Sequence, residues 1–206
     1  MDLSNKNAIV TGAGRGIGRS ISLFLAQSGA NVVAADLSLE DAEVVSREVV
    51  AEGRKSIPIC VDVTKQPSVE NMVGRAIDYF GRLDILVNNA GVVAAPGWEG
   101  RERANDDDWD ATFEVNVKGM ARVTDAVSER MKSVQYGKIV NISSIAGRQG
   151  TLTSAAYGAS KAAVINLTQF SAFDLAPYNI NVNSVCPGLL WTPMWERIAE
   201  RIQRNN

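Results

Sequence analysis

The sequence contains no histidine, and this absence limits the chemistry that the chain can perform. Nucleophile systems that pair serine or cysteine with histidine are excluded, and so are the usual zinc sites. We predict no metal site. Any acid–base chemistry must therefore be done by Tyr, Lys, Asp or Glu side chains.

Cysteine and long apolar runs are also scarce. Cys60 and Cys186 are the only cysteines, they lie far apart in the sequence, and each is in an apolar stretch. We expect buried thiols rather than a disulfide, and therefore a reducing cytoplasm. No apolar run approaches the roughly 20 residues that cross a bilayer, and the N-terminus has no apolar signal core. We expect no membrane partner.

A strong excess of one charge is missing as well. Lys and Arg total 21 against 23 Asp and Glu, which gives a net charge of −2. A nucleic-acid partner would need a basic face, so we predict none. Apolar residues make up 46% of the 206 residues, enough for one domain with a substantial core.

Short β-branched runs alternate with longer helical patterns along the chain. Strands are predicted over residues 7–11, 31–35, 56–61, 83–87, 137–142 and 181–185, and helices over 16–27, 38–51, 67–79, 107–132 and 155–175. This alternation, with near-continuous apolar strands, predicts an α/β fold: a doubly wound parallel β-sheet with helices on both faces, Rossmann-like, in a single domain spanning 1–206. In such sheets ligands bind beyond the carboxyl ends of the strands.

A glycine-rich stretch, residues 11–18, follows the first strand and opens a helix. Glycines let the backbone turn sharply and approach a pyrophosphate, whose charge then lies at the helix N-terminus. A tight turn with close packing is the alternative, but the strand–turn–helix context favours a dinucleotide. The predicted cofactor contacts are Gly12, Gly14, Arg15, Gly16, Ile17 and Gly18.

Asp36 ends the second strand and Leu37 follows it. A carboxylate here can accept hydrogen bonds from both ribose hydroxyls of adenosine and would repel a 2′-phosphate. Because Leu37 brings no positive charge, NAD is predicted over NADP. The alternative is that Asp36 caps the next helix, although Ser38 could do this instead.

Two further loops follow strands. After the third strand, Asp62 could accept the adenine amino group while Val63 packs against the ring. After the fourth, Asn89, Ala90 and Gly91 combine a polar amide with small residues that would let a cofactor pass. A simple turn at Asp62 and an ordinary loop at Asn89 are the alternatives.

Tyr157 and Lys161 lie four residues apart in an alanine-rich helical run, so they share a helix face. An ammonium group and the positive nicotinamide of NAD⁺ both favour phenolate, which would move the pKa of the phenol towards neutrality. For the pair alone, an ordinary helix surface is the simpler interpretation.

Taken together, the motifs resemble the short-chain dehydrogenase/reductase family across essentially all 206 residues. They occur in the family's order: residues 11–18, 88–91, Asn116, Ser144, 157–161, and Pro187-Gly188. The resemblance implies an NAD(P)-dependent oxidoreductase in which Tyr157 is the catalytic acid/base. It implies further that Lys161 tunes Tyr157 and binds the nicotinamide ribose, that Ser144 rather than Ser143 holds the substrate oxygen, and that Asn116 anchors a water in the proton relay.

The resemblance also implies the nicotinamide contacts and the assembly. Thr192 would contact the carboxamide with Leu190 beside it, and Pro187 and Gly188 precede them. A homo-oligomer, a dimer or tetramer, is implied. Family members usually continue through a further helix and a last strand. We therefore expect a fragment, or a sequence that omits a disordered part, rather than the alternative of a naturally shortened member, and we expect that Trp195 onward begins a substrate lid.

The resulting hypothesis is an NAD-dependent enzyme that interconverts a secondary alcohol and a ketone. The alternatives are an NADPH-dependent 3-oxoacyl-carrier-protein reductase and a non-catalytic NAD-binding scaffold. Residues 93–98, 146–152 and 191–195 could line the substrate site. Trp98, Trp191 and Trp195 there indicate either an apolar substrate, such as a cyclic one, or core packing. The charged cluster at 101–103 is expected to be a solvated loop, and the acidic cluster at 106–108 a helix N-terminus, which favours negative charge.

Overall fold

The computed structural model describes residues 2–150 and 154–204. Within these residues, six parallel strands form one sheet in the order β3-β2-β1-β4-β5-β6. The strands are β1 (Asn7–Thr11), β2 (Asn31–Asp36), β3 (Ser56–Cys60), β4 (Ile85–Asn88), β5 (Gly137–Ile142) and β6 (Ile180–Val185). The strand order reverses between β1 and β4, and this crevice is where a doubly wound sheet binds ligands.

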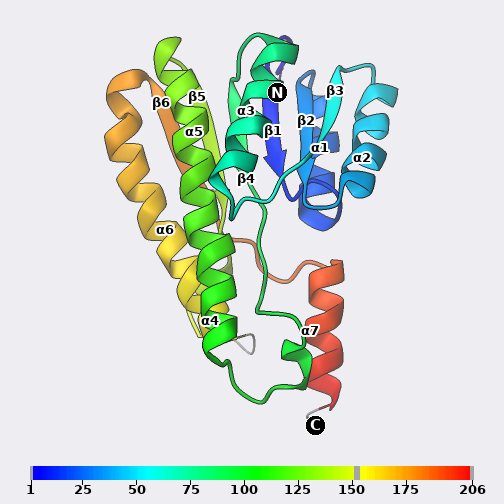
Figure 1. The fold of residues 1–206 in the computed structure, drawn as a ribbon, viewed down its shortest axis with the longest axis vertical. Helices are drawn as coiled ribbons and strands as arrows, with labels where there is room; N and C mark the ends of the chain where they lie inside the picture. Colours follow the sequence, from blue (N-terminus) through cyan, green and yellow to red (C-terminus); the bar gives the residue numbers. More distant parts are fainter. Residues whose placement is uncertain (1, 151–153, 205–206) are drawn as a thin grey trace.

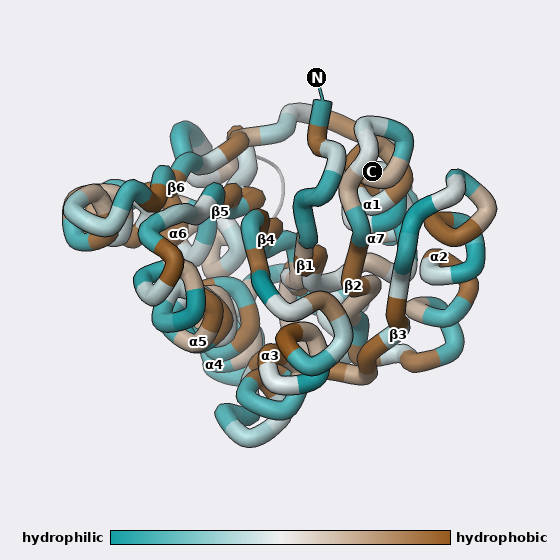
Figure 2. Tube along the Cα trace, turned by 90° about the horizontal axis from the view of Figure 1, so that it is seen from above, coloured by the Kyte–Doolittle hydropathy of each residue, from teal (hydrophilic) through white to brown (hydrophobic). Residues whose placement is uncertain are grey.

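Helices cover both faces of the sheet, as expected (Figures 1 and 2). On one face lie α1 (Gly16–Gln27) and α2 (Leu39–Ala51), which bury Ala26 and Val45 against β1 and β2. On the other lie α3 (Gln66–Phe80), α5 (Met120–Ser133) and α6 (Ala155–Leu175), which form the second core cluster with β4 and β5. The predicted three-layer fold is confirmed.

The carboxyl ends of the strands point to the part of the molecule where α4 (Asp106–Phe113) and α7 (Pro193–Arg204) lie (Figure 1). α7 packs against the short 3-10 helix η1 (Trp98–Gly100). Thus two segments about a hundred residues apart in sequence meet at the end of the sheet where the site is expected.

The helix predicted over residues 107–132 is interrupted. α4 is followed by a π-helical segment, Glu114–Gly119, before α5 begins at Met120. The hydrogen bonds of a π-helix span five residues rather than the four of an α-helix, and short segments of this kind occur frequently at functional sites. Asn116 lies inside it.

The prediction of buried cysteines is wrong. Cys60 is exposed and Cys186 is partly exposed, and both are free thiols. Cys60 ends β3 and Cys186 follows β6, the two edge strands, so apolar neighbours in the sequence do not enclose them.

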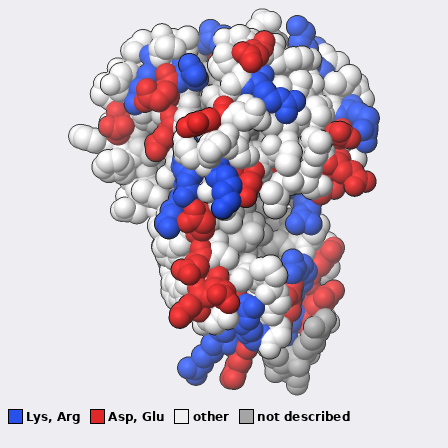
Figure 3. Space-filling model, viewed as in Figure 1, with Lys and Arg blue, Asp and Glu red and all other residues white. Residues whose placement is uncertain are grey.

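Acidic and basic side chains are interspersed over the face shown in Figure 3, without a large patch of one sign. In the described part of the chain, every helix is too short or too polar to cross a bilayer.

Candidate active site

The glycine stretch forms the turn from β1 into α1. Gly12 has φ +62°, a conformation that disfavours side chains, and a Cβ built on Gly18 would lie 2.0 Å from the carbonyl oxygen of Gly12. Arg15 is the N-cap of α1 but makes no side-chain cap, and the first turn has no acidic residue. This end of α1 therefore offers free N–H groups and the positive helix dipole, which fit the pyrophosphate of a dinucleotide.

Asp36 lies at the carboxyl end of β2, beside this turn. One carboxylate oxygen accepts from Gly14 N–H at 2.8 Å and the other from Ser38 N–H at 3.1 Å. Ser38 is the N-cap of α2, because its hydroxyl accepts from Asp41 N–H. This excludes the alternative that Asp36 caps α2. The Asp36 carboxylate instead stabilises the glycine turn through its hydrogen bond with Gly14.

Asp62 and Val63 follow β3. Asp62 accepts from both the backbone N–H and the hydroxyl of Thr64, and these hydrogen bonds lower the pKa of the carboxyl group. Val63 is buried against Gly119, on which a Cβ would lie 2.8 Å from a Val63 methyl carbon. Asp62 therefore stabilises its own turn, and a contact with adenine would be additional to this role.

Residues 89 and 90 are tied to β1 by Thr11, a contact that sequence reasoning missed. The Thr11 hydroxyl accepts from the N–H groups of Asn89 and Ala90, both at 3.1 Å. The Asn89 amide in turn donates to the carbonyl oxygens of Thr11 and Gly12. The only signal for Thr11 is a hydroxyl residue at the end of a strand directly before Gly12.

Asn116 links the loop after β4 to α6. Its side chain accepts from Val92 N–H at 2.8 Å and donates to Val92 C=O and to the Ser160 hydroxyl, both at 2.9 Å. Ser160, fully buried, donates to Tyr157 C=O at 2.7 Å. Ser160 was also missed, although it lies between Tyr157 and Lys161 in the sequence.

The predicted reaction residues come together at the carboxyl ends of β4 and β5. The Ser144 side chain interacts with the Tyr157 phenol and lowers its pKa, and Lys161 Nζ lies 5.7 Å from the centroid of the Tyr157 ring. Lys161 is buried and donates to Ile142 C=O at 2.8 Å. Ser143 is used elsewhere, because its buried hydroxyl donates to Lys161 C=O. Of the two serines, only Ser144 faces Tyr157.

Burial changes the pKa of both titratable groups. It raises the pKa of the Tyr157 phenol, although the hydrogen bond with Ser144 acts in the opposite direction. It lowers the pKa of the Lys161 ammonium to about 8. In the protein alone the pKa of the phenol is therefore shifted opposite to the predicted direction, because desolvation outweighs the interaction with Ser144.

The segment after β6 passes the loop after β5 and then reaches the glycine turn. Pro187 C=O accepts from Ile145 N–H at 3.0 Å, and Gly188 and Leu190 are exposed. The Thr192 hydroxyl accepts from Trp195 N–H at the start of α7, and its side chain lies 3.6 Å from where a Cβ on Gly16 would be. Thr192 thus borders the same crevice as the glycine turn.

The helix N-terminus predicted at 106–108 is confirmed, because α4 begins at Asp106 and its first turn is acidic; Asp108 is buried there, with an exposed fraction of 1%. Its carboxylate accepts from Ala95 N–H, Asn105 N–H and the Arg101 guanidinium, so it joins the loop after β4 to the start of α4. Among the proposed lining residues, Trp98 is buried and Trp191 is largely exposed, whereas 151 and 152 lie outside the described residues.

A dinucleotide crevice with a buried tyrosine and lysine beside it defines an NAD(P)-dependent oxidoreductase. A family model described as short chain dehydrogenase matches residues 6–203. The chain belongs to the short-chain dehydrogenase/reductase family.

Three similar proteins illustrate the range of activities. The 3-oxoacyl-[acyl-carrier-protein] reductase FabG of Thermotoga maritima is 39% identical, covering 98% of this chain and 80% of the relative. Trans-4-hydroxycyclohexanecarboxylate dehydrogenase of Sinomonas cyclohexanicum is 42% identical, covering 93% and 75%. A solved structure of NAD⁺-bound xylitol dehydrogenase is 38% identical, with a TM-score of 0.92, covering 99% of this chain and 78% of that one.

Proposed function

We propose that the protein is an NAD-dependent dehydrogenase/reductase that interconverts a secondary alcohol and a ketone. The observation that carries this proposal is the placement of Ser144 beside the Tyr157 phenol, whose pKa it lowers, with Lys161 behind the ring, at the edge of the dinucleotide crevice. Bound NAD would supply the hydride acceptor, or NADH the donor, for the substrate carbon.

The side chains would divide the proton chemistry among them. Ser144 donates a hydrogen bond to the substrate oxygen, where negative charge develops, an interaction worth about 3 kcal/mol in comparable sites. Tyr157 takes the proton of the alcohol, or returns it to the alkoxide. Lys161, whose pKa is about 8, remains mainly protonated at neutral pH and stabilises the phenolate. Asn116 and Ser160 hold the backbone around Tyr157 in place.

The preference for NAD rests on Asp36. Its carboxylate lies where the adenosine ribose is expected, and the exposed Leu37 beside it brings no positive charge. One observation favours an alternative: several relatives of about 38% identity are 3-oxoacyl-[acyl-carrier-protein] reductases. Such an enzyme would use NADPH, so the cofactor separates the two proposals.

The test combines cofactor binding with turnover. NADH and NADPH are titrated by fluorescence, and the wild type and Tyr157→Phe are assayed with small cyclic ketones, diketones and a 3-oxoacyl thioester. We expect tighter binding of NADH, and a decrease in turnover of about 10³-fold in the variant without loss of binding. Preferred NADPH together with thioester reduction would support the alternative. A folded sample that binds neither cofactor would contradict both.

We also propose a cytoplasmic homo-oligomer. The free thiols of Cys60 and Cys186 are compatible with a reducing compartment. Phe170 and Phe173, one turn apart on α6, are 68% and 85% exposed, a costly arrangement for a helix that faces only water.

A further inference from the structure

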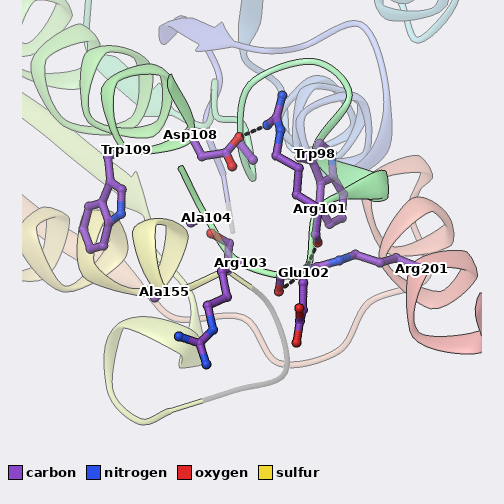
Figure 4. A pocket seen from close by; sticks show the side chains of 11 residues that line it. Trp98, Arg101, Glu102, Arg103, Ala104, Asp108, Trp109, Ala155 and Arg201 are labelled. Atoms are coloured by element: carbon purple, nitrogen blue, oxygen red, sulfur yellow. Dashed lines mark hydrogen bonds and ion pairs between the residues drawn. The ribbon is translucent and has the colours of Figure 1, made fainter. Parts of the chain in front are cut away.

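A pocket of about 340 Å³ lies between the loop after β4, the start of α6 and helix α7 (Figure 4). Trp98, Trp109 and Ala155 form apolar parts of its wall. It adjoins the reaction residues in two ways. Trp98 belongs to the same buried cluster as Tyr157, and Ala155 precedes Tyr157 by two residues in α6. A substrate held at Tyr157 can therefore extend into this pocket.

The arginines of the pocket are not equivalent. Arg101 is paired with the buried carboxylate of Asp108. Arg201 donates to the carbonyl oxygens of residues 101 and 102 and lies over the Trp98 ring, 5.3 Å from its centroid. Arg103 is exposed and, in the described part of the chain, makes no hydrogen bond or ion pair. Arg103 is thus the cation in this pocket available to a ligand.

The opposing charges leave a small positive excess. Asp108 neutralises Arg101, and the remaining acidic side chain of the wall is Glu102. Arg103 and Arg201 together against Glu102 leave one net positive charge, and in Figure 4 the Arg103 and Glu102 side chains diverge. One unit of charge matches a carboxylate better than a doubly charged phosphate.

Polar groups at the pocket that lack hydrogen-bond partners also favour an anionic ligand. Ser154, the N-cap of α6, makes no side-chain cap, and its buried hydroxyl oxygen has no hydrogen-bond partner. The first turn of this 21-residue helix has no acidic residue. Arg201 Nε is also buried without a partner. A hydroxyl donor, a guanidinium N–H and the positive end of α6 would all be satisfied by an anion.

We propose that this pocket binds a carboxylate of the substrate, with Arg103 as its counter-ion and the two tryptophans against its apolar body. The substrate would then be a cyclic or similarly apolar hydroxy or keto acid whose carboxylate lies beyond the reacting carbon. The reaction of this substrate rests on the proposed function, whereas the binding of its carboxylate in the pocket does not depend on it.

Binding is tested first, by calorimetry on the protein with and without NADH. Cyclohexanecarboxylate is compared with cyclohexanecarboxamide, which has the same shape without the charge. We expect the wild type to bind the acid about tenfold more tightly than the amide. Arg103→Gln should abolish this difference and Arg103→Lys should retain part of it. Arg75→Gln, at an exposed arginine of α3, is the matched control and should change nothing.

Equal binding of acid and amide by the wild type, or an unchanged preference in Arg103→Gln, would overturn the proposal. Turnover then separates this inference from the proposed function. Reduction of 4-methylcyclohexanone without any preference for 4-oxocyclohexanecarboxylate would contradict the carboxylate pocket alone. A charge preference in binding, with neither ketone reduced, would contradict the reaction and leave the pocket supported.

Discussion

Lys161 is buried in α6, and this burial lowers the pKa of its ammonium to about 8, against about 10.4 in an unfolded chain. Between these two values the unfolded state binds more protons than the folded state, so the stability of the fold increases with pH. The destabilisation of the fold by the buried ammonium charge has its full size below about pH 8, and it disappears as the pH rises towards about 10.4.

We therefore predict that the free energy of unfolding rises by about 2 kcal/mol between pH 8 and pH 9.5 because of Lys161. Urea denaturation of the wild type and Lys161→Met at several pH values measures this contribution as the difference between the two slopes. The raised pKa of Tyr157 acts with the opposite sign above pH 10, outside this window. Parallel profiles for the two proteins would contradict the prediction.

Single residues also show where sequence reasoning ends. Tyr157 and Lys161 could be found because residues four apart share a helix face, a local rule. Thr11 and Ser160 could not, because their roles depend on contacts with residues 44 to 79 positions away. The same limit applies to the charges: periodicity gave no sign that Asp108 would be buried under Arg101.

At the scale of elements, the turn from β1 into α1 needs its glycines for space. A Cβ on Gly18 would overlap the Gly12 carbonyl, whereas a Cβ on Gly74, in the middle of α3, would meet nothing within 4 Å. Both glycines are helical, so they form a matched pair.

We predict that Gly18→Ala lowers the thermal midpoint and weakens NADH binding. Gly74→Ala should stabilise the protein by about 0.5–1 kcal/mol, because glycine is unfavourable within a helix, and should leave NADH binding unchanged. Thermal denaturation and fluorescence titration of the two variants measure both effects. Equal behaviour of the two variants would show that the close packing at Gly18 is unimportant.

At the scale of the whole molecule, the fold was the most predictable property. Strand–helix alternation and apolar strands define the doubly wound sheet, and the observed strand bounds differ from those predicted by at most two residues. The exposure of Cys60 could not be predicted in this way, because it depends on which strands lie at the edges of the sheet. Strand order is set by tertiary packing, which local sequence patterns do not reveal.

The exposed aromatic pair on α6 leads to a prediction about assembly. If Phe170 and Phe173 are covered by a second copy, Phe170→Ser with Phe173→Ser should shift the protein towards the monomer in light scattering after size-exclusion chromatography. Phe24→Ser, at a 60% exposed phenylalanine of α1, is the control and should not change the mass. An unchanged mass in the α6 variant would place any interface elsewhere.

The π-helical segment Glu114–Gly119 has a consequence for how this helix can tolerate changes in length. Because the wide π turn accommodates one more residue than the α-helical turns around it, removing one residue here would give a regular helix that keeps α4 and α5 nearly in phase. Asp108 in α4 would then keep its contact with Ala95, whereas Asn116, which lies in the wide turn, would lose the direction that brings it to Val92 and Ser160. A single-residue deletion in this segment should therefore leave a longer, more regular helix in a folded protein that has lost the link between the loop after β4 and α6, whereas a deletion near Val134, at the end of α5, would leave Asn116 in place.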